Sequence, residues 1–359
     1  MQELKPKADQ IKNVVVRAPN WLGDVVMSVP ALRSLRRLLP EARITLVARP
    51  GATDIFIDAD LIDDVLIYER AGIASAWEQV RQWRRQRFDL AVLMQNAFEA
   101  ALIASLARVP MRVGYGTERR RILLTSPLPL PAWKDERHES FYYLNIISEL
   151  EQLLYRTSSV ETIPAQFAIN VSSDRKQKAR ALLSEHGLRV GAPLMLLCPG
   201  SINSRAKRWP AERYAALGDR LIESGANVVL IGSPGELDVS QEVCKHAQRQ
   251  PIVLTGITTV AEATALISIA DVLITNDTGP AHVGAALQTP TLVIFGPTNP
   301  LTTYPMSPNA EIVRRPPDCA PCMLRDCPID HRCMTAITPD EVFERASALI
   351  ARQPAEVSA

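Results

Sequence analysis

Residues 276–279 (Asn-Asp-Thr-Gly) form a short polar segment between an apolar run and a stretch with a helical pattern. We therefore expect them at the carboxyl end of a strand and the amino end of a helix. Free backbone N–H groups and the helix dipole make such a position an anion site, where Gly279 permits close approach and Thr278 adds a hydroxyl. The alternative is that Asp277 or Thr278 only caps the helix and that His282 packs within it.

Residues 199–210 (Pro-Gly-Ser-Ile-Asn-Ser-Arg-Ala-Lys-Arg-Trp-Pro) form a second loop between a strand and a helix. Ser201, Asn203 and the ammonium group of Lys207 could hold a diphosphate. The loop is neither a Walker A sequence nor a GxGxxG sequence, and the second absence counts against a nicotinamide dinucleotide site. The alternative is a solvated basic loop in which Trp209 anchors the start of the helix.

Two carboxylates follow other expected strands. Asp24 comes directly after Gly23, in the loop that follows the strand at 13–17. It could accept a proton from a hydroxyl group, or it could be a helix cap or a partner of the helix dipole. Glu236 follows the strand at 227–231, where it could bind a ribose or be an ordinary acid of a first helical turn.

Four of the six cysteines fall within fifteen residues, with His331 among them: Cys319, Cys322, Cys327 and Cys333. Only the first two have a spacing common in zinc sites. Zinc is therefore a weak candidate, and we expect free thiols in a surface loop. Two basic clusters are expected to be solvated faces or contacts for an anionic acceptor or lipid head groups: Arg81, Arg84, Arg85 and Arg87, and Arg119, Arg120 and Arg121.

Short β-branched runs alternate with helical patterns along the chain, which predicts α/β architecture with parallel sheets. We expect strands at 13–17, 44–48, 64–68, 90–94, 112–115, 194–198, 227–231, 252–254, 272–275 and 291–295. We expect helices at about 25–39, 139–155, 172–187 and from 210 onward. The strand–loop–helix–strand order begins twice, so we expect two Rossmann-like domains, 1–175 and 176–359, facing across a central cleft in which ligands bind.

Composition supports an ordinary globular protein of about two domains: 359 residues, 47% hydrophobic and 22% charged. Lys and Arg number 40 against 39 Asp and Glu, a net charge of +1, so we expect no nucleic-acid partner. No apolar run has the roughly 18 to 20 residues that a membrane-spanning helix needs. Because the first residues are polar, we expect no secretory signal and a cytoplasmic location.

Three segments together resemble the bacterial lipopolysaccharide heptosyltransferases, and the similarity extends from Asn13 to about Glu344. Residues 20–30 (NWLGDVVMSVP) look like the first glycine-aspartate loop of this family. Residues 199–210 are similar to its phosphate loop, and residues 276–282 (NDTGPAH) to its second diphosphate loop. The cysteine-rich segment looks like that of many heptosyltransferase II members.

The resemblance implies a GT-B fold and an inverting, metal-independent transfer of heptose without a cofactor. Asp24, after Gly23, would be the general base, and Lys207 would neutralise charge on the departing ADP. The resemblance also implies which residues would bind ADP-heptose. Ser201 and Asn203 would donate hydrogen bonds beside Lys207, and Glu236 would hold the ribose. The diphosphate would be surrounded by Asp277, Thr278, Gly279 and His282. Pro280 is a departure that matters: it has no N–H group, so that loop has one hydrogen-bond donor fewer than a non-proline residue would provide.

The function we expect is transfer of heptose from ADP-L-glycero-D-manno-heptose to an acceptor of lipid A, Kdo and one heptose. The acceptor would be met at the membrane surface, by an enzyme peripheral to the cytoplasmic face of the inner membrane. Alternatives are a heptosyltransferase I acting on Kdo2-lipid A, or a nucleotide-sugar-binding protein without turnover. The presence of both Asp24 and Lys207 argues against a binding protein without turnover.

Overall fold

The computed structural model describes residues 8–160 and 162–352. The chain forms two compact units that divide between Phe167 and Ala168. Within the described ranges, no helix combines the length and the apolar character needed to cross a membrane. The expectation of no secretory signal concerns in part residues 1–7, which lie outside the described residues.

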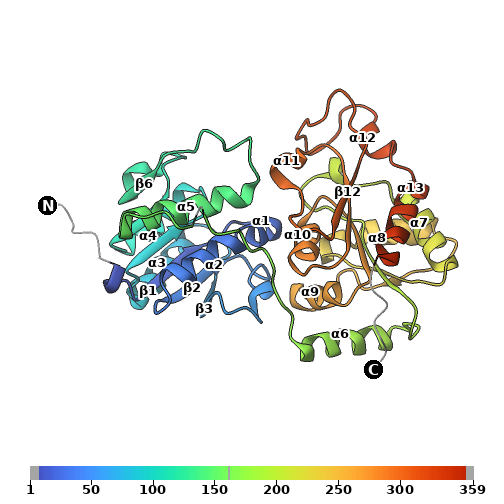
Figure 1. Cartoon of the computed structure of the whole chain (residues 1–359), viewed down its shortest axis with the longest axis horizontal. Coiled ribbons are helices and arrows are strands. Elements are labelled where there is room, and N and C mark those ends of the chain that lie inside the picture. The colour runs from blue at the N-terminus through green and yellow to red at the C-terminus, as the bar shows by residue number, and fades with distance from the viewer. Residues whose placement is uncertain (1–7, 161, 353–359) are drawn as a thin grey trace. The chain divides into compact units, whose positions relative to one another are not determined.

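The first unit is a six-stranded parallel sheet with the strand order β3-β2-β1-β4-β5-β6. Val14, Val15 and Val16 of the central strand β1 are fully buried, as expected for a parallel strand covered on both faces. Helix α5 packs along α2 over this sheet (Figure 1). The strands are β1 (Asn13–Arg17), β2 (Arg43–Ala48), β3 (Asp64–Ile67), β4 (Leu90–Leu93), β5 (Met111–Tyr115) and β6 (Ser126–Leu128), and the helices are α1 (Leu22–Met27), α2 (Val29–Leu38), α3 (Ile73–Gln86), α4 (Phe98–Leu106) and α5 (Glu139–Tyr155).

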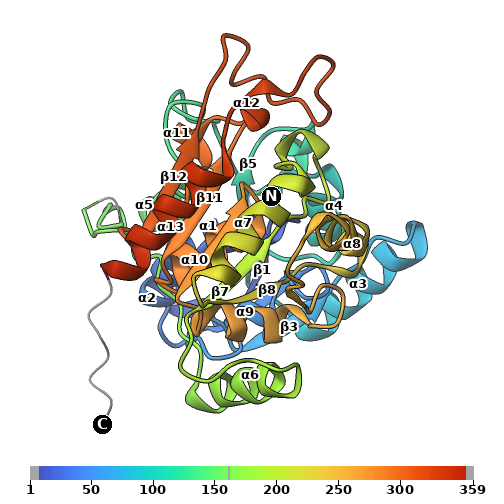
Figure 2. The same ribbon diagram turned by 90° about the vertical axis from the view of Figure 1, so that its right-hand side faces the viewer.

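The second unit repeats this plan, with all strands parallel in the order β12-β11-β10-β7-β8-β9. Helix α13 packs beside α7, as the two views in Figures 1 and 2 agree. The strands are β7 (Leu194–Cys198), β8 (Asn227–Leu230), β9 (Ile252–Val253), β10 (Val272–Asn276), β11 (Thr291–Phe295) and β12 (Ala310–Arg314). The helices are α6 (Ser173–Glu185), α7 (Ala211–Glu223), α8 (Leu237–His246), α9 (Val260–Ser268), α10 (Gly279–Ala286), α11 (Pro300–Thr303), α12 (Arg332–Thr335) and α13 (Pro339–Ala351).

The expected α/β class with two Rossmann-like units is confirmed, since each sheet has the doubly wound order and each expected strand is present. Two strands were not expected, β6 and β12, and both lie at a sheet edge. Strand β6 is short and contains Pro127, which an edge strand tolerates because one side of it makes no ladder hydrogen bonds.

The expected helix at 25–39 is wrong in one respect, because it is divided into α1 and α2 at Ser28. Pro30 has no N–H group and cannot donate to the carbonyl four residues before it, so a continuous helix would lack that bond. The Ser28 hydroxyl donates to the Val25 carbonyl at 2.7 Å. The break ends α1 within two turns and leaves Asp24 in its first turn.

The division between the units lies before the expected boundary at 175/176. Ile169 already donates its N–H to the Ala286 carbonyl of α10, at 2.9 Å. Arg175 of α6 donates from Nη2 to the Ala261 carbonyl of α9, at 2.6 Å. Residues that follow Phe167 therefore bond to the second unit.

Arg120 corrects the expectation that the cluster 119–121 forms a solvated face. Its side chain is fully buried, and burial lowers its pKa to about 10. Its guanidinium donates to the carbonyls of Tyr115 at 2.7 Å, Gln95, and Leu93 at 3.4 Å, and to Asn96 Oδ1 at 2.9 Å. It is a structural cation that joins the ends of β4 and β5.

Arg120→Met should lower the free energy of unfolding of the first unit by about 3 kcal/mol or more, because several buried carbonyl groups lose their donor. Urea denaturation followed by circular dichroism measures this change. The control is Arg121→Met at the exposed neighbouring position, which should change stability by less than about 0.5 kcal/mol. Equal effects of the two substitutions would show that Arg120 is not the structural cation.

Candidate functional site

The two diphosphate-loop candidates leave neighbouring strands at the point where the strand order reverses. Strand β7 precedes residues 199–210, strand β10 precedes residues 277–279, and the two strands pair directly. Their carboxyl ends meet at one edge of the sheet, which is where ligands bind in open α/β folds. The sheet thus brings together segments about seventy residues apart in sequence.

The buried side chain of Asn276 ties these two loops together. Its Nδ2 donates to the carbonyls of Pro199 at 2.8 Å and Gly200 at 3.2 Å. Its Oδ1 accepts from the Trp209 backbone N–H and the Tyr214 hydroxyl, both at 3.1 Å. One amide therefore fixes both ends of the 199–210 loop against the end of β10. Asn276 lies within a predicted motif, but this role of its side chain was not predicted.

Lys207 and Asp277 form an ion pair at this edge. Lys207 Nζ lies 2.9 Å from Asp277 Oδ2 and donates to the Asp277 carbonyl at 3.0 Å. The Asp277 side chain is 3% exposed and the Lys207 side chain 26% exposed. Thr298 donates its hydroxyl to Asp277 Oδ2 at 2.6 Å. The ammonium group is thus held two residues before α10 begins, with part of its surface open to a ligand.

The amino end of α10 begins with an extended Thr278 and then Gly279 and Pro280. Neither of the proposed caps operates: the Thr278 side chain makes no cap hydrogen bond, and the Asp277 carboxylate pairs with Lys207. Among the described residues, the Gly279 N–H has no hydrogen-bond partner, so it is a donor for an anion. His282 is 7% exposed within α10, which agrees with the packing alternative for this residue.

The remaining predicted residues of the 199–210 loop differ in their burial and contacts. Ser201 is buried, and its carbonyl accepts from Arg208 Nε at 3.1 Å and Nη2 at 3.0 Å. Asn203 is exposed, and within the described chain no side-chain contact joins it to Lys207. The anchoring role of Trp209 is seen: its indole is 1% exposed and donates to the Ile337 carbonyl at 3.1 Å.

Glu236 is an acid of a first helical turn, as one of its two alternatives predicts. Its Oε2 accepts from the backbone N–H of Ser233 at 2.8 Å and the Ser233 hydroxyl at 2.7 Å, forming a capping box. The same carboxylate lies against Gly200, where an added Cβ would be 2.3 Å from Oε1. The acid of the β8 loop is therefore packed on the loop of the adjacent strand β7, and a Cβ at Gly200 would require the Glu236 carboxylate to move.

The cysteine-rich segment packs on the loop that carries Lys207, a contact that sequence separation concealed. Both backbone groups of Ala206 bond to this segment: its N–H donates to the Arg325 carbonyl at 2.9 Å, and its carbonyl lies 2.7 Å from His331 Nε2. Ser204 donates its hydroxyl to the Arg325 carbonyl at 3.2 Å. The residue next to Lys207 is thus clamped from outside its own loop.

The six thiols are free. Burial, followed by the nearby thiols of Cys327, Cys322 and Cys319, raises the pKa of Cys333 to about 11. Across the described ranges, no three His, Cys, Asp or Glu side chains are arranged to hold a metal ion, so the geometry gives the weak zinc candidate no support. An Asp-x-Asp sequence, Asp58-Ala59-Asp60, precedes β3 and has no third ligand beside it.

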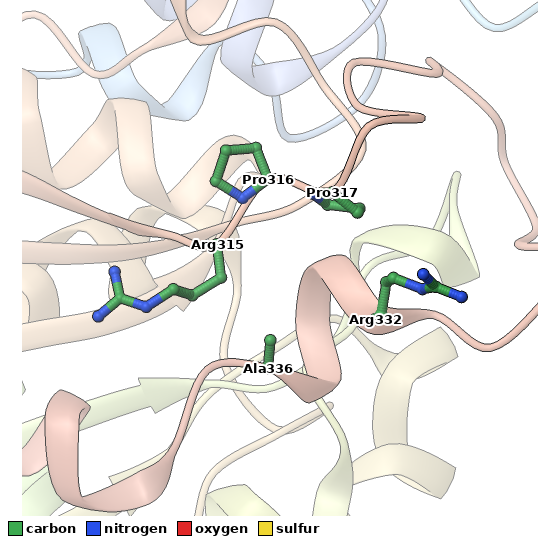
Figure 3. A pocket seen from close by; sticks show the side chains of 5 residues that line it. All are labelled: Arg315, Pro316, Pro317, Arg332 and Ala336. Carbon is green, nitrogen blue, oxygen red and sulfur yellow. The ribbon is translucent and has the colours of Figure 1, made fainter.

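A cavity of about 280 Å³ opens beside the cysteine-rich segment (Figure 3) and is lined by Arg315, Pro316, Pro317, Arg332 and Ala336. The two arginine side chains point away from one another (Figure 3). Each is already paired: Arg315 with Glu341 at 2.7 Å, and Arg332 with Asp330 at 2.6 Å. The cavity therefore lacks convergent polar groups and is a poor candidate for a ligand site.

In the first unit, Asp24 lies in the first turn of α1 beside a buried tyrosine. Tyr143 of α5 donates its hydroxyl to Asp24 Oδ1 at 3.1 Å. Tyr143 is 4% exposed, and its pKa is well above the ordinary value, first because of burial and then because of the Asp24 charge. Gly23 is buried before it. The tyrosine stays a donor at neutral pH and orients the carboxylate, a partner that the sequence analysis missed.

A sequence profile of glycosyltransferase family 9 (heptosyltransferase) matches residues 76–332. The chain belongs to this family and is a glycosyltransferase. The family resemblance expected from the three loops is thus confirmed.

Within the family, the chain is similar to several proteins that are named heptosyltransferase 2 or II. Lipopolysaccharide heptosyltransferase 2 of Escherichia coli K12 is 29% identical over 95% of this chain and 99% of that protein. Lipooligosaccharide heptosyltransferase 2 of Haemophilus ducreyi is 27% identical over 94% and 99%. The structure of E. coli ADP-heptose LPS heptosyltransferase II matches with a TM-score of 0.82 at 26% identity, over 95% and 99% of the two chains.

The Lys207–Asp277 pair should show a measurable coupling in a double-mutant cycle. Lys207→Met and Asp277→Asn should each destabilise the second unit, with a coupling energy of about 1 to 2 kcal/mol, because the carboxylate is buried. Urea denaturation of the two single variants and the double variant measures it. The exposed pair Arg205–Asp326, 2.7 Å apart, is the control and should couple by less than about 0.5 kcal/mol. Equal coupling in both pairs would contradict the buried character of the site.

Proposed function

We propose that this glycosyltransferase transfers heptose from ADP-L-glycero-D-manno-heptose to the heptosyl-Kdo2-lipid A inner core of lipopolysaccharide, with inversion and without a metal ion. The names of the relatives that match nearly the whole chain support the second heptose rather than the first. The observation that carries the proposal is the Lys207–Asp277 pair beside the amino end of α10.

The second unit is the donor domain in this proposal. The diphosphate binds at the Gly279 N–H, with Thr278, Ser201 and Asn203 as further donors. As the bond between the anomeric carbon and the diphosphate oxygen breaks, its electron pair leaves with ADP. The partly exposed ammonium group of Lys207 stabilises that charge. Glu236, with Oε1 over Gly200, accepts hydrogen bonds from the ribose, and Asp277 and His282 frame the site from within.

The first unit is the acceptor domain. Asp24 Oδ2 takes the proton of the acceptor hydroxyl while Oδ1 remains hydrogen-bonded to Tyr143. The hydroxyl oxygen forms its bond to the anomeric carbon on the face opposite the departing diphosphate, and this single displacement inverts the configuration. Because the acceptor is a glycolipid, the protein acts at the cytoplasmic face of the inner membrane as a peripheral enzyme.

Asp24→Asn should lower the rate of heptose transfer by about 10²- to 10⁴-fold, because the amide cannot accept the proton. Its affinity for ADP, measured by titration calorimetry, should equal that of the unchanged protein. Tyr143→Phe keeps the carboxylate and should reduce the rate by about tenfold only. The assay is run with and without EDTA, which should not alter the rate. Full activity of Asp24→Asn, or loss of ADP binding in it, would remove Asp24 from the role of base.

Gly200→Ala should weaken ADP binding by about tenfold, because the added Cβ displaces the Glu236 carboxylate from its position over the loop. Gly235→Ala is the matched control, since a Cβ there would lie 4.0 Å from the nearest atom. Titration calorimetry with ADP compares the two variants. The same affinity in both would place Glu236 outside the nucleotide site and leave it as a capping residue.

A further inference from the structure

A cavity of about 100 Å³ lies at the carboxyl end of the first sheet, and none of the residues assigned above to the donor lines it. Its lining comes from the end of β1, from the turns that follow β1, β2, β3 and β4, and from the first turn of α4: Arg17, Asn20, Arg49, Tyr68, Arg70, Gln95, Ala97, Glu99 and Ala100. Strands β1 and β4 are adjacent, and the strand order reverses between them. It is the position at which an open α/β sheet binds ligands.

Arg17 places a positive charge in the wall of this cavity. Its side chain is 4% exposed, and burial lowers its pKa to about 10, so it is protonated at neutral pH. Nη1 donates to the carbonyls of Ala18 at 2.9 Å and Val47 at 3.3 Å, and Nη2 to Asn20 Oδ1 at 3.2 Å. All of these acceptors are neutral. Among the described residues no carboxylate forms an ion pair with Arg17.

The rest of the lining adds positive charge. Arg49 and Arg70 follow β2 and β3, and Glu99 is the one acid among the lining residues. Glu99 is already engaged, because it accepts from the Tyr68 hydroxyl and pairs with Arg70 Nε at 2.9 Å. Three arginines against one glutamate leave the lining with two positive charges in excess. The Glu99 charge raises the pKa of Arg17, but Glu99 forms its ion pair with Arg70 and not with Arg17. A buried cation without an ion pair is costly, and a bound anion would offset that cost.

We infer that this cavity binds a single anionic group, a phosphate ester or a carboxylate, with Arg17 and Arg49 as its charged ligands. The source we assign, the anionic core of the glycolipid acceptor, rests on the proposed function. Asn20 lines the cavity, and the same loop continues through Trp21, whose ring lies 5.4 Å from the Arg49 guanidinium, to Asp24. An anion held here would therefore fix the acceptor relative to the base.

The test has a binding arm that does not depend on catalysis. Inorganic phosphate is titrated into the full chain at constant ionic strength while the backbone amide signals of Asn20 and Ala97 are followed by NMR. Saturable shifts are expected in the unchanged protein and in Arg85→Gln, which replaces an exposed arginine of α3. The shifts should be lost in Arg49→Gln. Arg49 is exposed, so its replacement leaves the fold intact. Absence of shifts, or equal shifts in Arg49→Gln, would overturn the anion site.

The kinetic arm identifies the source of the anion. Arg49→Gln should raise KM for the acceptor about tenfold and leave KM for ADP-heptose unchanged, and inorganic phosphate should compete with the acceptor but not with the donor. Phosphate binding with an unchanged acceptor KM would overturn the assignment to the acceptor and leave a site for free phosphate. If the protein transfers no heptose, the proposed function fails, while the NMR titration still decides the anion site.

Discussion

A single buried amide determines the geometry of the second unit's ligand edge. Asn276 uses both its donor and its acceptor atoms to hold the start and the end of the 199–210 loop. The position of Lys207 depends on this restraint, because the loop between Gly200 and Trp209 would otherwise be free to move away from β10. The His331 and Arg325 contacts restrain Ala206 from the other side. The contacts of Asn276, His331 and Arg325 thus position Lys207 beside Asp277, and the ion pair depends on them.

The architecture could be predicted from sequence because central parallel strands are continuous apolar runs. Val14–Val16 and residues 194–197 are buried, and short β-branched or leucine-rich runs of this kind are typical of a parallel strand covered on both faces. Edge strands lack this signal. Strand β6 was concealed by its proline, and β12 has one fully buried residue, Val313. Local breakers such as Pro30 also matter, because a helical period alone does not show where a helix is interrupted.

The site could be predicted only in part, because the residues that contact its motifs are far from them in sequence. Loop motifs at Asp24, Lys207 and Asp277 are local, and their place after strands follows from the sheet. Their partners are not local: Tyr143 lies on a helix 119 residues after Asp24, and His331 lies 125 residues after Ala206. Arg120 shows the same limit, since one arginine of a basic run is buried by carbonyl groups that only the folded backbone brings together.

The partly exposed Lys207 and the buried Arg17, each at the end of its own sheet, differ in whether the protein supplies an ion-pair partner. Lys207 has Asp277, so its charge is balanced by a carboxylate of the protein. Arg17 donates hydrogen bonds only to neutral acceptors, and Glu99 acts on it without forming an ion pair. Long-range attraction of a charged ligand depends on net charge and is screened over about 8 Å at physiological ionic strength. On the proposed assignments, the glycolipid is drawn electrostatically toward the first unit, whereas the nucleotide sugar finds its site by short-range contacts, so salt governs the encounter with one substrate far more than with the other.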